Sequence, residues 1–314
     1  MFTLGIIGLG AMGAQMARAA TDHPDFVISW AADVREDLIE EARSRFRDVT
    51  FTTDPYAVIG SDVDAIYVAT PPATHADLVV AALGAGKAAF CEKPLAVSAA
   101  DGRRMVEAAQ RAGLANAVNF ALSDRDAVLE LGRALASGEV GEVREVEIRV
   151  GFPVWPRGFQ AHAAWLDGRD QGGFVREVLS HFVYLTDKLL GPLTTEHARV
   201  HYAEPDRSEL SAVGVLSASG IPVQVTGVAG MAGPEFYEWT LWGEKRSYRL
   251  SGWGVLSAWD GSHWSEVALS GPKGSEATRL TRFAAAMRGT PQPDLADFES
   301  ALRVQTVIES FHQR

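Results

Sequence analysis

Six residues near the N-terminus have the types and spacing of a phosphate-binding turn. Between the apolar segment Phe2–Ile7 and a segment expected to be helical, Ala11–Ala20, the chain reads Gly8-Leu9-Gly10-Ala11-Met12-Gly13. The first glycine permits a tight turn, the second lets the backbone approach a pyrophosphate, and the third lets helix and strand pack closely. The start of the helix offers unpaired N–H groups to the phosphates. We expect this turn, including Ala11 and Met12, to hold a dinucleotide.

An acidic residue follows the second apolar segment, Phe26–Ala32. It is Asp33, twenty residues after Gly13, where a carboxylate accepts hydrogen bonds from the adenosine ribose and repels a 2′-phosphate. Asp33 therefore favours NAD, whereas Arg35 could pair with that phosphate and leaves NADP as an alternative. A glycine-rich turn with Asp33 as a helix cap is the simpler explanation. We prefer the dinucleotide site because strand, turn, helix and acid occur in register.

The elements that must position these residues follow two patterns. Up to about residue 120, apolar runs alternate with amphipathic segments, which is typical of a parallel sheet covered by helices on both faces. After Asp124, strand-like runs follow one another with few helices between them, which predicts one large, mostly antiparallel sheet. The sequence thus predicts an α/β fold, with a Rossmann NAD(P)-binding domain over residues 1–120 and an α+β substrate-binding and oligomerisation domain over residues 121–314.

Composition narrows the classes of function. The chain has 314 residues, enough for two domains, and its net charge of −11 disfavours nucleic-acid binding. The single cysteine, Cys91, excludes an intramolecular disulfide and a thiolate metal cage. The N-terminus reads as a strand rather than a signal peptide, and no run of about 18 apolar residues predicts a membrane span. We expect a cytoplasmic protein without a metal and without nucleic-acid or membrane partners.

Two further motifs point to a family. Ala69-Thr70-Pro71-Pro72-Ala73-Thr74-His75 follows one apolar segment, and Cys91-Glu92-Lys93-Pro94-Leu95 ends another. With the glycine turn, they resemble the Gfo/Idh/MocA family of glucose–fructose oxidoreductase, inositol dehydrogenase and rhizopine-catabolism dehydrogenases, over nearly the whole chain. The resemblance implies that the cofactor site also includes Thr70, Pro71, His75 and Glu92.

The resemblance also implies a catalytic lysine. In that family the lysine of Glu-Lys-Pro reaches the substrate hydroxyl beside the nicotinamide, and here it is Lys93. Active sites in open parallel sheets lie outside the carboxyl ends of strands, where Lys93 is expected. An ammonium group there can stabilise the alkoxide that develops during hydride removal. The alternative is a solvated loop lysine.

A second hallmark of the family is Gly-Gly followed by Asp-x-x-x-His on a helix. This chain has Gly172-Gly173 followed by Glu177 and His181, which share one helix face. The resemblance makes His181 the general base, which its ordinary pKa of about 6.5 suits, while Glu177 orients the imidazole or binds a neighbouring hydroxyl. A solvated Glu–His pair is the simpler alternative, and a metal site is disfavoured because no further ligand cluster is evident.

The chain departs from the family pattern at three positions, all expected near the substrate. Glu177 replaces aspartate, Tyr184 stands where a second aspartate is common, and the segment Val118–Ser123 keeps Asn119 but has no arginine. Asn119 is still expected to contact the substrate. The cofactor is therefore better supported than the substrate.

An aromatic and basic segment follows the first strand of the second domain. Phe152–Gln160 and the residues after it are expected to form a lid or substrate wall, in which aromatic rings stack on a sugar and arginines bind hydroxyls or a carboxylate. The residues concerned are Trp155, Arg157, Trp165 and Arg176. The alternative is a loop that packs on the sheet or on another subunit, and a homodimer or homotetramer through the C-terminal sheet is expected.

The preferred function is an NAD(P)-dependent oxidoreductase that transfers a hydride between nicotinamide and a hydroxyl-bearing carbon of a sugar, cyclitol or related polyol. One alternative is a glycoside hydrolase that uses NAD without net redox. Another is a non-catalytic dinucleotide-binding sensor, which the joint presence of Lys93 and His181 disfavours.

Overall fold

The strands of the first part of the chain form a parallel sheet. Within the described residues its order is β3-β2-β1-β4-β5-β6, and every neighbouring pair is parallel. This is the strand order of a Rossmann fold, which confirms the predicted class. β4 and β5 are buried along their whole length, as strands covered on both faces must be. The bounds are β1 (Phe2–Ile7), β2 (Phe26–Ala32), β3 (Thr50–Thr52), β4 (Ala65–Val68), β5 (Ala88–Cys91) and β6 (Asn116–Val118).

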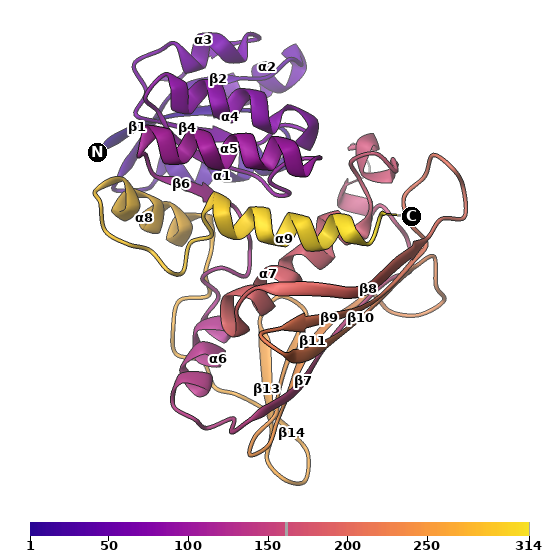
Figure 1. Cartoon of the computed structure of the whole chain (residues 1–314). Coiled ribbons are helices and arrows are strands. Elements are labelled where there is room, and N and C mark those ends of the chain that lie inside the picture. The colour runs from indigo at the N-terminus through magenta and orange to yellow at the C-terminus, as the bar shows by residue number, and fades with distance from the viewer. Residues whose placement is uncertain (161–162, 314) are drawn as a thin grey trace. The chain divides into compact units, whose positions relative to one another are not determined.

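Helices connect these strands, and each begins shortly after a strand ends. α4 and α5 lie side by side against the sheet (Figure 1). A short 3-10 turn, Pro72–Thr74, leads directly into α4. The helices are α1 (Ala11–Thr21), α2 (Glu36–Arg45), α3 (Pro55–Ile59), α4 (His75–Gly84) and α5 (Ala99–Ala112).

The computed structural model describes residues 1–160 and 163–313, which divide into two units. The first unit contains residues 1–120 and 274–302, and the second contains residues 121–273 and those from 303 onward. The sequence assigned 274–302 to the second domain, but its helix α8 (Glu276–Met287) packs in the first unit (Figure 1). Its Phe283 is fully buried, with its ring centroid 5.1 Å from that of Phe90 and 6.2 Å from that of Phe26. Burial of this apolar helix face explains why residues 274–302 pack with the first unit and not with the second.

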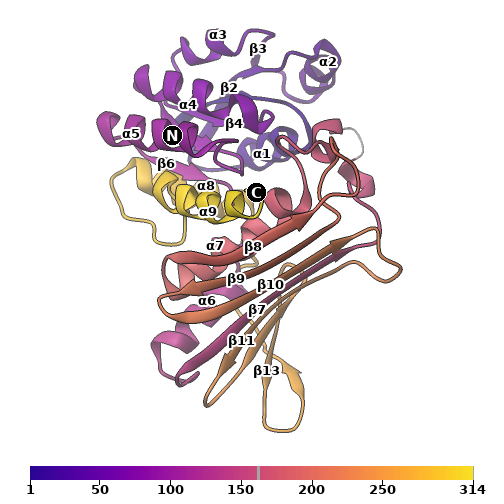
Figure 2. The ribbon, with the colours of Figure 1, turned by 45° about the vertical axis from the view of Figure 1, so that its right-hand side comes forward.

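The second unit is built on a large, mostly antiparallel sheet, as predicted. In the described part its order is β14-β13-β12-β11-β7-β10-β9-β8, and only β7 and β10 pair in parallel. Figure 2 shows β8, β9, β10, β7 and β11 side by side. The bounds are β7 (Val143–Phe152), β8 (Leu193–His201), β9 (Ser211–Ala218), β10 (Ile221–Ala229), β11 (Phe236–Gly243), β12 (Tyr248–Ser251), β13 (Val255–Trp259) and β14 (Trp264–Glu266).

Helices of the second unit lie on one face of this sheet (Figure 2). They are α6 (Asp126–Ala136) and α7 (Ser180–Leu190), and a π-helical turn, Val175–Leu179, runs directly into α7. Short 3-10 turns occur at Gly158–Gln160 and Ala164–Asp167. The last helix is α9 (Phe298–Ser310). Its residues up to 302 are assigned to the first unit, and those from 303 onward are assigned to the second. Among the described helices, none has the length and apolar composition that crossing a membrane requires.

Candidate active site

The glycine turn joins β1 to α1, and its three glycines lie in different surroundings. Gly8 has a φ of +97°, and a Cβ added to Gly13 would lie 1.8 Å from the carbonyl oxygen of Gly8. A Cβ at Gly10, in contrast, would meet nothing within 4 Å. Gly8 and Gly13 are therefore required by the fold, whereas the surface beside Gly10 is open to a ligand.

The start of α1 is electrostatically suited to an anion. Gly10 is the N-cap residue, it has no side-chain capping hydrogen bond, and the first turn of α1 contains no acidic residue. The positive end of the helix is thus not neutralised by its own side chains. Ala11 and Met12 are both exposed there. These observations fit the pyrophosphate of a dinucleotide.

Asp33 lies at the end of β2 and is fixed by two backbone groups. Its Oδ2 accepts a hydrogen bond of 2.7 Å from the N–H of Leu9, and its Oδ1 accepts one of 2.9 Å from the N–H of Arg35. A carboxylate has about four acceptor positions, so it retains capacity for ribose hydroxyls. The exposed guanidinium of Arg35 forms an ion pair with Asp37, with 3.1 Å between Arg35 Nε and Asp37 Oδ1. This ion pair raises the pKa of Arg35.

His75 has a different role from the one expected at the cofactor. Its ring is fully buried, with Nδ1 3.0 Å from the carbonyl oxygen of Pro94 and Nε2 2.9 Å from that of Thr70. Burial lowers the pKa of His75. The neutral ring has one N–H, so it donates to one of these carbonyls while it packs between the loops that follow β4 and β5. Within the first loop Thr70 is half-buried and Pro71 is exposed, so these two remain accessible.

Glu92 and Asn119 belong to a buried polar network in the first unit. Asn119 donates from Nδ2 to Glu92 Oε1 at 2.7 Å, and its Oδ1 accepts a hydrogen bond of 2.6 Å from Arg279. Asn119 is only 4% exposed, so its amide holds Glu92 rather than pointing to a substrate. The half-buried Lys93 donates its backbone N–H to Glu92 Oε2 at 3.3 Å. Sequence reasoning missed Arg279, which lies far along the chain.

His181 occupies the first turn of α7 and is nearly buried. Its Nδ1 accepts a hydrogen bond of 3.3 Å from the N–H of Ala121, and the edge of Trp253 lies against it with ring centroids 5.1 Å apart. With Nδ1 as acceptor, the neutral imidazole carries its hydrogen on Nε2. The tautomer with hydrogen on Nδ1 would set two N–H groups against each other, so it requires a small shift of the Ala121 backbone.

Glu177 is part of a polar cluster that also contains Arg157. Gln160 donates to Glu177 Oε1 at 2.9 Å and accepts from Arg157 Nε at 2.8 Å, and Arg157 Nη2 is 3.7 Å from Glu177 Oε1. Arg157 also donates to the hydroxyl of Tyr237 at 3.1 Å. Trp253 connects this cluster to His181, because its ring centroid is 5.2 Å from that of Tyr237.

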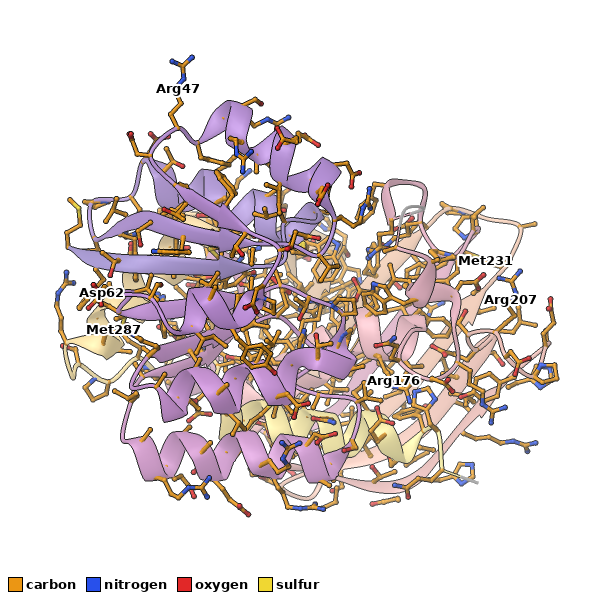
Figure 3. All side chains as sticks on the ribbon, turned by 90° about the horizontal axis from the view of Figure 1, so that it is seen from above. Arg47, Asp62, Arg176, Arg207, Met231 and Met287 are labelled. Atoms are coloured by element: carbon orange, nitrogen blue, oxygen red, sulfur yellow. The ribbon has the colours of Figure 1, made fainter. Side chains whose placement is uncertain are left out.

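Of the remaining predicted substrate residues, Trp155 lies beside this cluster, with the Arg157 guanidinium 5.7 Å from its ring centroid. Trp155 donates its indole N–H to the carbonyl of Leu166 at 3.2 Å and packs on Phe152. Trp165 is half-buried in the turn Ala164–Asp167. Arg176 forms two hydrogen bonds of 2.8 Å with Glu309 and lies among the side chains of the second unit, as Figure 3 shows. Its guanidinium is thus used by the fold rather than offered to a substrate.

Within residues 1–160 and 163–313, no group of three or more histidine, cysteine, aspartate or glutamate side chains is arranged to hold a metal ion. The buried Cys91 has a raised pKa because of its burial, which disfavours the thiolate.

Two models of one protein family match the chain. The "Oxidoreductase family, NAD-binding Rossmann fold" matches residues 2–120, and the "GFO/IDH/MocA C-terminal domain" matches residues 128–249.

Curated relatives are similar mainly over part of their length. The chain is 34% identical over 193 residues to a dTDP-3,4-didehydro-2,6-dideoxy-alpha-D-glucose 3-reductase from Saccharopolyspora spinosa, covering 59% of this chain and 54% of the relative. It is 31% identical over 154 residues to a myo-inositol 2-dehydrogenase from Thermotoga maritima, covering 49% and 46%. The chain thus spans about half the length of the curated relatives it matches.

Solved structures share the fold over almost the whole chain. One is the WlbA dehydrogenase from Bordetella pertussis in complex with NADH and UDP-GlcNAcA, with a TM-score of 0.84, 22% identity and coverage of 99% of this chain and 95% of the other. Another is an oxidoreductase from Agrobacterium radiobacter with NAD+, L-tartaric acid and magnesium, with a TM-score of 0.85, 18% identity and coverage of 99% and 95%.

Proposed function

The chain belongs to the Gfo/Idh/MocA oxidoreductase family, with its NAD-binding Rossmann fold, and we propose that it transfers a hydride between nicotinamide and a hydroxyl-bearing carbon of a sugar, cyclitol or related polyol. The observation that carries the proposal is the open surface at Gly10, at the start of α1, beside a turn that Asp33 holds through Leu9. The names of relatives that act on inositol and on a dTDP-sugar support the class of substrate.

The cofactor is proposed to lie against the carboxyl ends of β1, β2 and β4. Gly8–Gly13 would hold the pyrophosphate, and Asp33 would bind the adenosine ribose. Thr70 and Pro71 would contact the part of the dinucleotide beyond the pyrophosphate. When bound, NAD supplies the acceptor or donor of hydride. The ion pair between Arg35 and Asp37 supports NAD over NADP, because it occupies the guanidinium that would bind a 2′-phosphate.

Lys93 is proposed to stabilise the reacting oxygen of the substrate. Its ammonium group would oppose the negative charge that develops when a hydroxyl loses its proton. The support is its place directly after β5, at the carboxyl edge of the sheet, and the hydrogen bond that fixes its backbone to Glu92.

His181 is proposed to exchange the hydroxyl proton through Nε2. The Trp253 ring against it and its near-complete burial limit access of water to the imidazole. The cluster of Glu177, Gln160 and Arg157 is proposed to bind neighbouring hydroxyls, since it contains both donors and acceptors.

An assembly of identical chains is also proposed, as a homodimer or homotetramer. Large apolar side chains are exposed on two separate strands of the second-unit sheet, Val213 and Val215 on β9 and Val255 and Trp259 on β13. Contact with another chain would remove these side chains from water. Light scattering coupled to size-exclusion chromatography tests this, and a monomer at every concentration would contradict it.

A cytoplasmic location is a further proposal, which fractionation of cells tests.

The experiment for the activity is a panel of polyols, aldoses and sugar acids, offered with NAD and with NADP. Formation of NADH, followed by its near-ultraviolet absorbance, is expected with at least one polyol or sugar. Consumption of a glycoside without accumulation of NADH would instead indicate a hydrolase. Tight binding of NADH with no turnover across the panel would indicate a sensor.

A further inference from the structure

A buried chain of hydrogen bonds in the first unit leads from α8 to the backbone of Lys93. Arg279, on α8, donates from Nε to Asn119 Oδ1 at 2.6 Å and from Nη2 to Glu276 at 2.9 Å. Asn119 donates to Glu92 Oε1 at 2.7 Å, and Glu92 Oε2 accepts from the N–H of Lys93 at 3.3 Å. Arg279 is 2% exposed and Glu92 is 5% exposed.

The direction of each bond in this chain is fixed by chemistry. Arginine has only donors, so it must take the amide oxygen of Asn119, and the amide must then present its NH₂ group to Glu92. The hydroxyl of Tyr67 also donates to Glu92 Oε1 and accepts from Asn119 at 3.1 Å. Burial raises the pKa of Tyr67 well above its ordinary value, which keeps this hydroxyl protonated as a donor. Asn119 therefore has one amide orientation in which every partner matches.

We propose that Arg279 is a positioning residue that acts through Asn119 and Glu92 to fix the backbone from which Lys93 projects. The inference rests on the catalytic role proposed for Lys93. Four segments far apart in sequence meet in this network, namely β4, the loop after β5, the residue after β6 and α8. In metal sites, mutation of a residue that orients a ligand typically lowers metal affinity or activity about 10- to 100-fold. We expect a loss of activity of the same order when a residue that orients Lys93 is removed.

Asn119→Asp is the most direct test because it changes the pattern of donors without changing shape. The introduced carboxylate keeps an acceptor for Arg279 but meets the carboxylate of Glu92, so the two repel each other unless one takes up a proton, and kcat is therefore measured up to alkaline pH. We expect kcat to fall at least about 10-fold, while the affinity for NADH, measured by fluorescence, stays close to that of the wild type. A fall in melting temperature with unchanged kcat would show a purely structural network and overturn the proposal.

The double variant Glu92→Gln with Asn119→Asp should restore activity. In it the new amide nitrogen at position 92 donates to the new carboxylate at position 119 and to the hydroxyl of Tyr67. The new amide oxygen accepts from the N–H of Lys93, and Arg279 keeps an acceptor at position 119. In Glu92→Gln alone, by contrast, a donor faces either Asn119 or Lys93. Recovery of kcat in the double variant relative to both single variants is the expected result, and no recovery overturns the proposal.

Two controls separate this inference from the function on which it rests. Arg288→Gln removes an exposed arginine at the end of the same helix, which pairs with Asp25, and should leave kcat unchanged. If Lys93→Ala has wild-type activity, the proposed function fails. If Lys93→Ala is inactive but Asn119→Asp and Arg279→Lys retain full kcat, only the role of Arg279 is overturned.

Discussion

The carboxylate of Asp33 accepts a hydrogen bond of 2.7 Å from the backbone N–H of Leu9. This contact joins the end of β2 to the middle of the glycine turn. One residue would therefore serve two purposes, since it holds the turn in place and retains acceptor capacity for a ribose. The choice of dinucleotide follows from this contact and from the pairing of its neighbour Arg35.

Loss of the Asp33 carboxylate should weaken the use of NAD. In Asp33→Ser we expect KM for NAD to rise at least about 10-fold, because a charge-assisted hydrogen bond is removed. Adding Asp37→Asn releases Arg35, so the ratio of kcat/KM for NADP to that for NAD should rise further. Steady-state kinetics with both dinucleotides measure this, with the exposed Asp48→Asn as control. An unchanged ratio in the double variant would refute the proposed role of the Arg35–Asp37 pair.

Two glycine variants separate folding from binding. Gly13→Ala places a Cβ 1.8 Å from the carbonyl oxygen of Gly8 and should lower the melting temperature markedly. Gly10→Ala meets nothing within 4 Å and should leave the melting temperature almost unchanged, but weaken NADH binding by about 10-fold or more because the pyrophosphate loses its close approach. Equal NADH affinity in Gly10→Ala and the wild type would argue against a phosphate at this turn.

Arg157 should affect the substrate and not the dinucleotide. Arg157→Gln removes the donors that reach Gln160 and Tyr237 and the positive charge beside Glu177. We expect KM for the polyol to rise about 10-fold or more, with NADH affinity unchanged. Arg149→Gln, an exposed arginine on β7 that pairs with Glu238, is the matched control. If Arg157→Gln weakened NADH binding by the same factor as it raised KM for the polyol, the substitution would be disturbing more of the protein than the Glu177–Gln160–Arg157 cluster.

His312 should make stability depend on pH. Burial, with smaller contributions from Arg176 and Arg169, lowers the pKa of His312 to about 3. Between that value and about 6.5, the unfolded chain binds a proton that the folded chain does not, so this contribution to stability is lost as pH falls from about 6.5 towards 3. Denaturant unfolding at neutral pH and near pH 5 measures it.

The variant His312→Asn should show a smaller loss of stability between these pH values than the wild type. His197→Asn changes an exposed histidine on β8 and should keep the wild-type dependence. Identical pH dependence in wild type and His312→Asn would show that another group is responsible.

Local patterns in the sequence predicted the parts of the site that are themselves local. The glycine turn, Asp33 and the alternation of strands and helices depend on residues close together in the chain, and the structure has them in the expected elements. Partnerships across the chain could not be predicted in this way. Asn119 was expected at the substrate because it is polar and follows a strand, but its oxygen is taken by Arg279, 160 residues away.

Arg176 illustrates the same limit. An arginine near aromatic residues suits a sugar site, yet Glu309 on α9 binds it in the folded chain. Neither the spacing nor the composition of either segment indicates that pairing. Trp253 was missed for a related reason, because only the fold of the sheet brings its ring against His181.

The proposed chemistry depends on Lys93 and His181, and their alanine variants test it most directly. With NAD and the best substrate of the polyol panel, single-turnover and steady-state rates would be measured together with NADH affinity. We predict that Lys93→Ala and His181→Ala each lower turnover at least about 100-fold while NADH still binds. Near-wild-type rates in both variants would contradict the mechanism.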